Sequence, residues 1–134
     1  MADTVADFIW KRLHHWGARR VYGYPGDGIG GLVGALHRMQ KDAQDDADAP
    51  CIDFVQVRHE EMAGLCASAH AKFTGEVGLC MATSGPGAIH LLNGLYDARG
   101  DHMPVVALVG QQARSMLTGR CCGTSSRACR RQSI

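Results

Sequence analysis

The sequence predicts an α/β protein whose parallel sheet is covered by helices on both faces. Short apolar segments alternate with longer amphipathic segments, and turns rich in Gly and Pro separate them. A succession of strand, helix and strand requires right-handed crossovers, which keep the strands parallel and place helices on both sides. We therefore expect three layers, with ligands at the carboxyl ends of the strands.

Each expected element has a local sequence signal. The first helix has Asp3 or Thr4 as an N-cap and Gly17 to close it, and Pro104 precedes the last strand. Residues 41–50 carry four aspartates and are expected to form a solvated connection. The expected helices are residues 3–15, 29–39, 60–73 and 88–97, and the expected strands are residues 20–24, 52–57, 77–82 and 105–109.

Composition excludes several classes of partner. A formal net charge of +1 over 134 residues gives no reason to expect nucleic acid as a ligand. The longest clean apolar run, residues 105–109, is too short to span a bilayer, and the acidic start does not resemble a secretory signal, so we expect a cytoplasmic protein. No cysteine or histidine spacing is typical of zinc, so we expect no metal ligands; the cysteines are Cys51, Cys66, Cys80, Cys121, Cys122 and Cys129.

Three junctions between a strand and a helix carry unusual sequence: residues 23–28, 57–62 and 82–87. Parallel topology gathers them onto one edge of the sheet, where they can form a single site. The first contains a GxGxxG pattern at residues 26–31, followed by an acidic cluster, which is compatible with a dinucleotide site. Glycines that let the chain approach a ligand or a neighbouring backbone are the safer interpretation, because the chain has 17 glycines and the acidic cluster precedes the second strand.

The second junction places Glu60 at the start of a helix, directly after an apolar strand. A carboxylate there meets the positive end of the helix and the expected cleft, although a helix-capping acid is the simpler interpretation, for which Glu61 is the natural candidate. Desolvation in a cleft predicts a raised pKa for Glu60. In the third junction, Gly85, Pro86 and Gly87 form either a tight turn or a backbone surface for a flat ligand.

Six blocks that occur in order add to these signals. Together they resemble the pyrimidine-binding (Pyr) domain of the thiamine-diphosphate-dependent pyruvate oxidase and acetolactate synthase family, which has a flavodoxin-like three-layer fold. The blocks are Gly-Tyr-Pro-Gly-Asp at 23–27, Arg-His-Glu-Glu-Met-Ala at 58–63, Ala-His-Ala-Lys-Phe-Thr-Gly at 69–75, Ala-Thr-Ser-Gly-Pro-Gly-Ala at 82–88, Asn-Gly-Leu-Tyr-Asp-Ala at 93–98 and Pro-Val-Val-Ala-Leu-Val-Gly-Gln at 104–111.

The resemblance implies roles for individual residues. Glu60 becomes the carboxylate that hydrogen-bonds the pyrimidine nitrogen of thiamine diphosphate and so activates the cofactor toward a 2-oxo acid. Gln111 approaches the reacting end of the cofactor, and His59 supports the Glu60 loop, whereas His90 is expected to be an ordinary helix residue. The residues that match cofactor-binding loops are Pro25, Gly26, Asp27, Gly85, Pro86 and Gly87.

The resemblance also implies what lies beyond this domain. We interpret residues 1–118 as an incomplete, C-terminally truncated Pyr domain and residues 119–134 as a non-homologous, disordered tail. The diphosphate, Mg²⁺ and, in some members, FAD are held by other domains, so the chain is expected to be inactive alone. Its partners would be further copies of itself or the diphosphate-binding domain of a second chain, with pyruvate or a similar 2-oxo acid as substrate. A non-catalytic module that binds a partner chain is the alternative.

Overall fold

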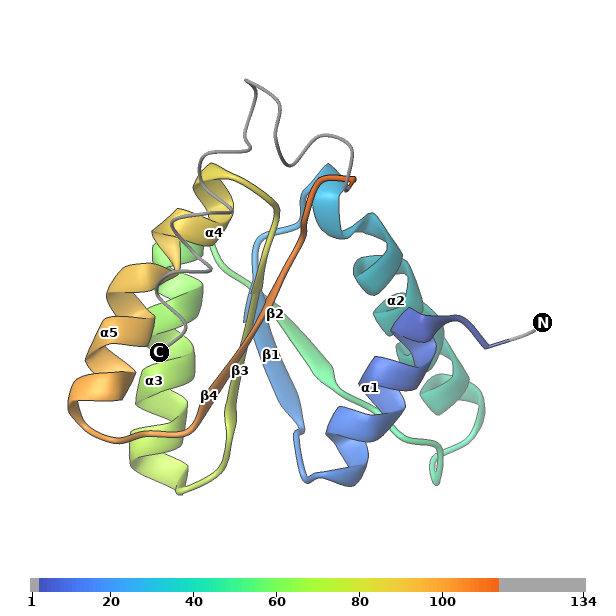
Figure 1. The fold of residues 1–134 in the computed structure, drawn as a ribbon. Coiled ribbons are helices and arrows are strands. Elements are labelled where there is room, and N and C mark those ends of the chain that lie inside the picture. The colour runs from blue at the N-terminus through green and yellow to red at the C-terminus, as the bar shows by residue number, and fades with distance from the viewer. Residues whose placement is uncertain (1–2, 114–134) are drawn as a thin grey trace.

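In a computed structural model that describes residues 3–113, a four-stranded parallel sheet lies between two layers of helices (Figure 1). The strands follow the order β2-β1-β3-β4, and every pairing is parallel. The α/β prediction is therefore confirmed. The elements are α1 (Val5–His15), β1 (Arg20–Gly23), the 3₁₀ helix η1 (Asp27–Ile29), α2 (Gly30–Asp45), β2 (Asp53–Gln56), α3 (Glu60–Thr74), β3 (Gly78–Ala82), α4 (Pro86–His90), α5 (Leu92–Gly100) and β4 (Val105–Val109).

The strand order decides between the two interpretations of the first junction. β1 pairs with β2 on one side and with β3 on the other. The strands that follow β2 are therefore added on the opposite side of β1. This is the flavodoxin-like order, whereas a dinucleotide-binding half places its second and third strands on the same side of the first. The topology thus disfavours the dinucleotide interpretation of residues 26–31.

Side chains of the central strand β3 divide the interior into two cores. All five residues of β3 are buried, and successive side chains of a strand point to opposite faces. Leu79 and Met81 pack with α1 and α2, while Cys80 and Ala82 pack with α3. Figure 1 shows the same division, with α1 and α2 on one face and α3, α4 and α5 on the other.

Two elements differ most clearly from the prediction, whereas the other boundaries agree to within about two residues. Helix α2 continues to Asp45, so the first half of the expected connection at residues 41–50 is helical. A helix that buries only one stripe, here Ala35, Leu36 and Met39, tolerates a mostly polar last turn. The expected helix at 88–97 is two helices, because α4 begins early at Pro86, a residue favoured in a first turn, and gives way to α5 around Leu91.

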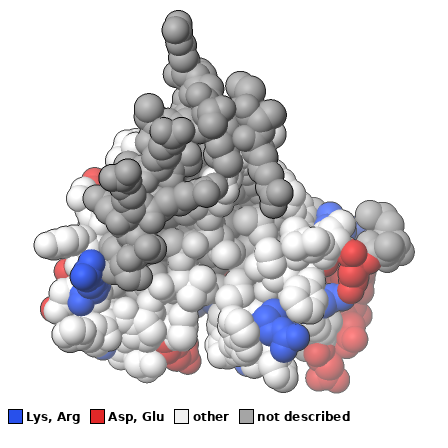
Figure 2. Space-filling view, viewed as in Figure 1, with Lys and Arg blue, Asp and Glu red and all other residues white. Residues whose placement is uncertain are grey.

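Charge is distributed unevenly over the face seen in Figure 2. Acidic side chains gather on the side that carries α1 and α2, and uncharged side chains cover much of the middle of this face. Among residues 3–113, no helix combines the length and apolar character that a bilayer crossing requires. The tail predicted at 119–134 lies outside the described residues.

Candidate functional site

The loops that follow the four strands meet at one edge of the sheet, as the parallel topology predicts. The amide of Gly28, after β1, donates to Thr83 Oγ1, after β3, at 3.1 Å. The Gln112 side chain, after β4, donates to Ser84 Oγ at 3.2 Å. The β1, β3 and β4 loops are therefore held to one another by direct hydrogen bonds.

Glycines make this close approach possible. A Cβ atom on Gly26 would lie 2.7 Å from Thr83 Cβ, and one on Gly28 would lie 2.8 Å from Thr83 Oγ1. A Cβ on Gly87 would lie 2.9 Å from Thr83 Cγ2. Thr83 therefore occupies the space that three missing side chains leave, and the first two glycines of the GxGxxG pattern, Gly26 and Gly28, serve loop packing in this chain.

Glu60 is the first residue of α3, and its side chain is only 14% exposed. One carboxylate oxygen, Oε2, lies 3.1 Å from His90 Nδ1 on α4. The other, Oε1, borders Gly87, where an added Cβ would be 3.2 Å away. The carboxylate is thus fixed on one side by an imidazole and faces a residue without a side chain on the other.

The pKa predicted for Glu60 is wrong in direction for this chain. Desolvation is the largest single influence and does raise the pKa, as expected. It is outweighed by the backbone amide of Glu60, by the hydrogen bond and charge of His90, and by the charge of His59, which together leave the pKa below its ordinary value. Sequence reasoning anticipated the burial and missed the histidines.

His59 and His90 flank the carboxylate. Their ring centroids are 4.4 Å apart with planes tilted by 35°. His59 is the N-cap of α3, because its Nδ1 accepts from the amide of Glu61 at 3.3 Å. Glu61, expected to cap the helix, instead accepts from Asn93 Nδ2 at 2.5 Å.

His90 was expected to be an ordinary helix residue, and that expectation is wrong. It lies in the short helix after the Gly-Pro-Gly turn, and this places it against the start of α3. The order of the parallel strands brings those two junctions to the same edge. The sequence signal that pointed to the junctions, namely their position after strands, could have extended to His90.

The remaining predicted site residues lie on loops of the same edge. Gly85 is buried with φ of 71°, a conformation that favours glycine, and Pro86 is exposed. Asp27 and Gln111 are exposed, and within residues 3–113 no hydrogen bond or ion pair joins either of them to Glu60. The structure therefore brings Glu60 and Gly87 together and leaves Asp27 and Gln111 at the periphery. Pro25 and Gly26 are partly buried in the β1 loop.

One cluster of potential metal ligands was not foreseen. His59, Glu60 and His90 each offer a ligand atom, and these atoms lie within 4.8 Å of one another. The expectation of no metal ligands rested on cysteine and histidine spacing along the chain. A cluster assembled from two separate loops has no such spacing.

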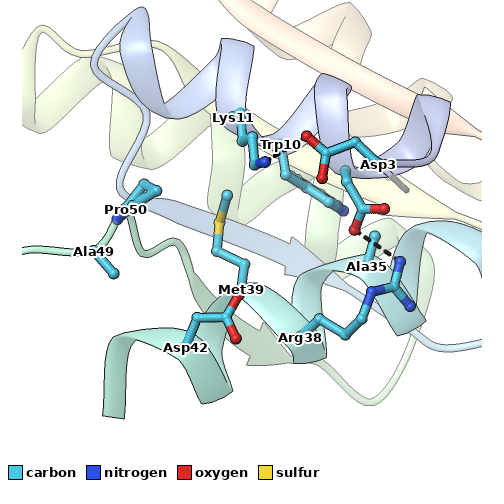
Figure 3. A pocket seen from close by; sticks show the side chains of 10 residues that line it. Asp3, Trp10, Lys11, Ala35, Arg38, Met39, Asp42, Ala49 and Pro50 are labelled. Carbon is cyan, nitrogen blue, oxygen red and sulfur yellow. Dashed lines mark hydrogen bonds and ion pairs between the residues drawn. The ribbon is translucent and has the colours of Figure 1, made fainter. Parts of the chain in front are cut away.

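A cavity of about 380 Å³ lies away from this edge, between α1, α2 and the loop before β2 (Figure 3). Its charged groups are largely occupied, since Lys11 pairs with Asp3 at 2.6 Å and Arg38 with Asp7 at 2.7 Å. Trp10 lines it, with the indole nitrogen bonded to the Leu32 carbonyl at 2.8 Å.

Comparison with known proteins identifies the class. Residues 3–127 match the sequence profile of the family described as "Thiamine pyrophosphate enzyme, N-terminal TPP binding domain", and the chain belongs to this family. It is 46% identical over 103 residues to a pyruvate oxidase of Lactiplantibacillus plantarum, covering 77% of this chain and 16% of that protein. It is 39% identical over 114 residues to an acetolactate synthase of Mycobacterium avium, covering 85% of this chain and 17% of that protein.

The chain spans about a sixth of the length of these curated relatives. The resemblance noted in the sequence is therefore confirmed at the level of the family and its fold. The names pyruvate oxidase and acetolactate synthase describe the activities of those longer proteins.

Proposed function

We propose that this chain forms the half of a thiamine diphosphate site that binds the aminopyrimidine ring, with Glu60 as the carboxylate that meets the ring nitrogen. The observation that carries the proposal is the position of Glu60. Its carboxylate is almost buried, lies at the carboxyl edge of a parallel sheet, and keeps Oε1 directed toward Gly87 rather than toward another side chain. Ligands of open α/β sheets bind at this edge.

The residues present suit an aminopyrimidine. Such a ring is flat and carries nitrogen donors and acceptors at its rim, so it needs a polar group at one edge and small residues against its face. Glu60 provides the polar group, and Gly85 and Gly87 provide buried backbone without side chains. The bound cofactor would supply the electron sink for decarboxylation of a 2-oxo acid, which protein side chains lack.

Each side chain has a distinct task in this proposal. Glu60 exchanges a proton with the pyrimidine nitrogen, and His90 is a positioning residue that holds Oε2 so that Oε1 stays available. Pro25, Gly26, Asp27 and Pro86 shape the loops around the ring, and Gln111 reaches toward the reacting end. Thr83 holds the β1 and β3 loops at a fixed separation through Gly28.

The activity proposed for the assembled protein needs more than this chain. A diphosphate-binding domain, in another copy or a second chain, would hold Mg²⁺ and the diphosphate, and FAD would be present in an oxidase. The substrate would be pyruvate or a related 2-oxo acid. Alone, the chain is proposed to be inactive.

Calorimetry with thiamine diphosphate and Mg²⁺ tests the proposal, using the chain alone and with the diphosphate-binding domain of a pyruvate oxidase relative. We expect binding in the mixture and decarboxylation of pyruvate, which Glu60→Gln lowers by roughly 10²- to 10⁴-fold because a proton-transfer group is lost.

Glu76→Gln is the matched control, since Glu76 is an exposed glutamate paired with His70 away from the site. It should leave both binding and rate unchanged. Cofactor binding without any decarboxylation would indicate a non-catalytic module, and an unchanged rate in Glu60→Gln would refute the role given to Glu60.

A further inference from the structure

We propose that His59, Glu60 and His90 form a binding site for a divalent transition-metal ion of the zinc type. We further propose that an ion held there competes with the aminopyrimidine for the Glu60 carboxylate. The second statement rests on the proposed function, whereas the first concerns ion binding alone. The site would make cofactor loading sensitive to free transition metals.

The distances suit direct coordination. Zinc binds imidazole nitrogen and carboxylate oxygen at about 2.0–2.2 Å, so two ligands on one ion lie roughly 3.4 Å apart. His90 Nδ1 and Glu60 Oε2 are already 3.1 Å apart, and an ion can take the place of the proton that they share. The whole set lies within 4.8 Å, so His59 must approach by about an ångström to complete the site.

His59 is free to make that movement. Its side chain is 49% exposed, and its ring already lies against the ring of His90. When His59 binds an ion through Nε2, its Nδ1 can exchange the bond that it accepts from the Glu61 amide for one that it donates to Glu61 Oε2, which lies 4.0 Å away while Asn93 holds the other Glu61 oxygen. Carboxylates that accept from the second nitrogen of a ligating histidine commonly fix its orientation.

The ligand types select the class of ion. Two imidazoles and one carboxylate suit Zn²⁺, Ni²⁺, Co²⁺ and Cu²⁺, whereas Mg²⁺ prefers oxygen ligands and retains its water. Three protein ligands leave at least one position open, as in sites that exchange their fourth ligand. The positive end of α3 opposes a cation, and the paired acids Glu60 and Glu61 in its first turn offset that field.

Accessibility completes the argument. The side chain of His90 is 41% exposed and that of His59 is 49% exposed, so an ion can reach the cluster from solvent. Glu60, at 14%, forms the inner ligand. An ion on Oε2 would draw the carboxylate away from Gly87 and neutralise it, which removes the acceptor that the proposed function requires.

Zinc chloride and nickel chloride titrations by calorimetry, on the tag-free 134-residue chain, test the ion site. Cys121, Cys122 and Cys129 are changed to Ser in every protein, since thiolates also bind zinc. We expect one ion per chain, binding at least tenfold weaker in His90→Gln and in His59→Asn, and no binding of Mg²⁺ at this site. His15→Gln, an exposed histidine at the end of α1, should bind as the parent does.

Circular dichroism of each variant verifies the fold, which substitutions of two partly exposed histidines should preserve. The ion site would be overturned if the His59→Asn, His90→Gln double variant bound zinc and nickel as tightly as the parent does. It would also be overturned if the parent bound neither ion. A second titration, of thiamine diphosphate and Mg²⁺ into the chain with its diphosphate-binding domain, measures competition. We expect saturating zinc to weaken cofactor binding at least tenfold in the parent and far less in the double variant.

The two proposals fail in different ways. Zinc binding through the histidines without cofactor binding would refute the proposed function and leave the ion site standing. Cofactor binding that zinc does not weaken, with zinc bound through the histidines, would overturn the competition alone.

Discussion

The two helical layers of this domain differ in the size of the side chains that pack against the sheet. The layer of α1 and α2 packs large apolar side chains against the sheet, among them Trp10, Leu36 and Met39. The core beneath α3, α4 and α5 contains mostly small residues, among them Ala63 and Ala67 of α3 and Cys80 of β3. The first layer supplies apolar burial, and the second brings backbones close together beside the candidate site.

Close backbone contact is most pronounced between α3 and α5. A Cβ atom added to Gly94 would overlap the backbone carbon of Gly64, and one added to Gly64 would lie 2.8 Å from the Leu91 carbonyl oxygen. Leu91 separates α5 from α4, which carries His90. The packing of small residues therefore determines where His90 stands relative to Glu60.

The largest loss of stability is expected from a substitution in the layer of α1 and α2, which packs the large side chains. Trp10 is fully buried, so Trp10→Ala should lower the free energy of unfolding by about 3–5 kcal/mol through lost burial and an enlarged cavity. Urea denaturation followed by circular dichroism measures the change, and Trp10→Phe provides a milder variant if the alanine variant does not fold. In the fraction that remains folded, the ion and cofactor affinities should equal those of the parent, and a change in either would show that the layers are coupled.

The sequence predicted this layer well because large side chains at helical spacing leave a clear pattern. The first helix, its Thr4 cap and the strand that follows agree with the structure to within a few residues. The structure of the layer of small residues was harder to predict from the sequence. Alanine and glycine carry little periodic signal, so the division of residues 86–100 into α4 and α5 was not foreseen.

A smaller loss of stability is expected from a substitution in the layer of α3, α4 and α5, which packs the small residues. Gly94→Ala should destabilise the protein by about 1–3 kcal/mol, since its Cβ meets backbone that cannot move aside. It should also weaken zinc binding, because α5 and the adjoining α4 shift away from α3 and separate His90 from Glu60. Urea denaturation and the zinc titration described above measure the two effects.

Gly100→Ala is the matched control for this prediction. It lies in the same helix, and a Cβ there would meet nothing within 4 Å. Its stability should be unchanged or higher by up to about 1 kcal/mol, as expected for alanine in a helix. A Gly94→Ala variant as stable as Gly100→Ala would mean that the α3–α5 contact is loose.

The candidate site was predictable in position and less so in its contacts. Glu60 follows an apolar strand and begins a helix, which is enough to place it at the carboxyl edge. Its partnership with His90 depends on a contact between residues thirty positions apart, and its pKa depends on that partnership. The roles assigned to Gln111 and Asp27 stay predictions.

In each layer, an aspartate ties two helices together. Asp7 on α1 binds Thr4 and reaches Arg38 on α2 at 2.7 Å. Asp97 on α5 accepts from buried Ser68 and from Lys72, both on α3, at 2.7 Å. Hydrogen bonds from Thr4 and then Arg38 lower the pKa of Asp7 to about 2, and hydrogen bonds from Lys72 and Ser68 lower that of Asp97.

These shifts predict the smallest effect, a loss of stability in acid. A carboxyl group whose pKa is lower in the folded protein stabilises it above the unfolded pKa, and this contribution disappears as pH falls through the folded pKa. For Asp7 the loss should fall between about pH 4 and pH 2. Thermal midpoints measured from pH 5 to pH 2 should therefore decline less steeply in Asp7→Asn than in the parent. Asp97→Asn should flatten the decline less, because the pKa of Asp97 is lowered by less than that of Asp7, so that less of its stabilisation is lost in acid. A larger flattening in Asp97→Asn than in Asp7→Asn would contradict this order.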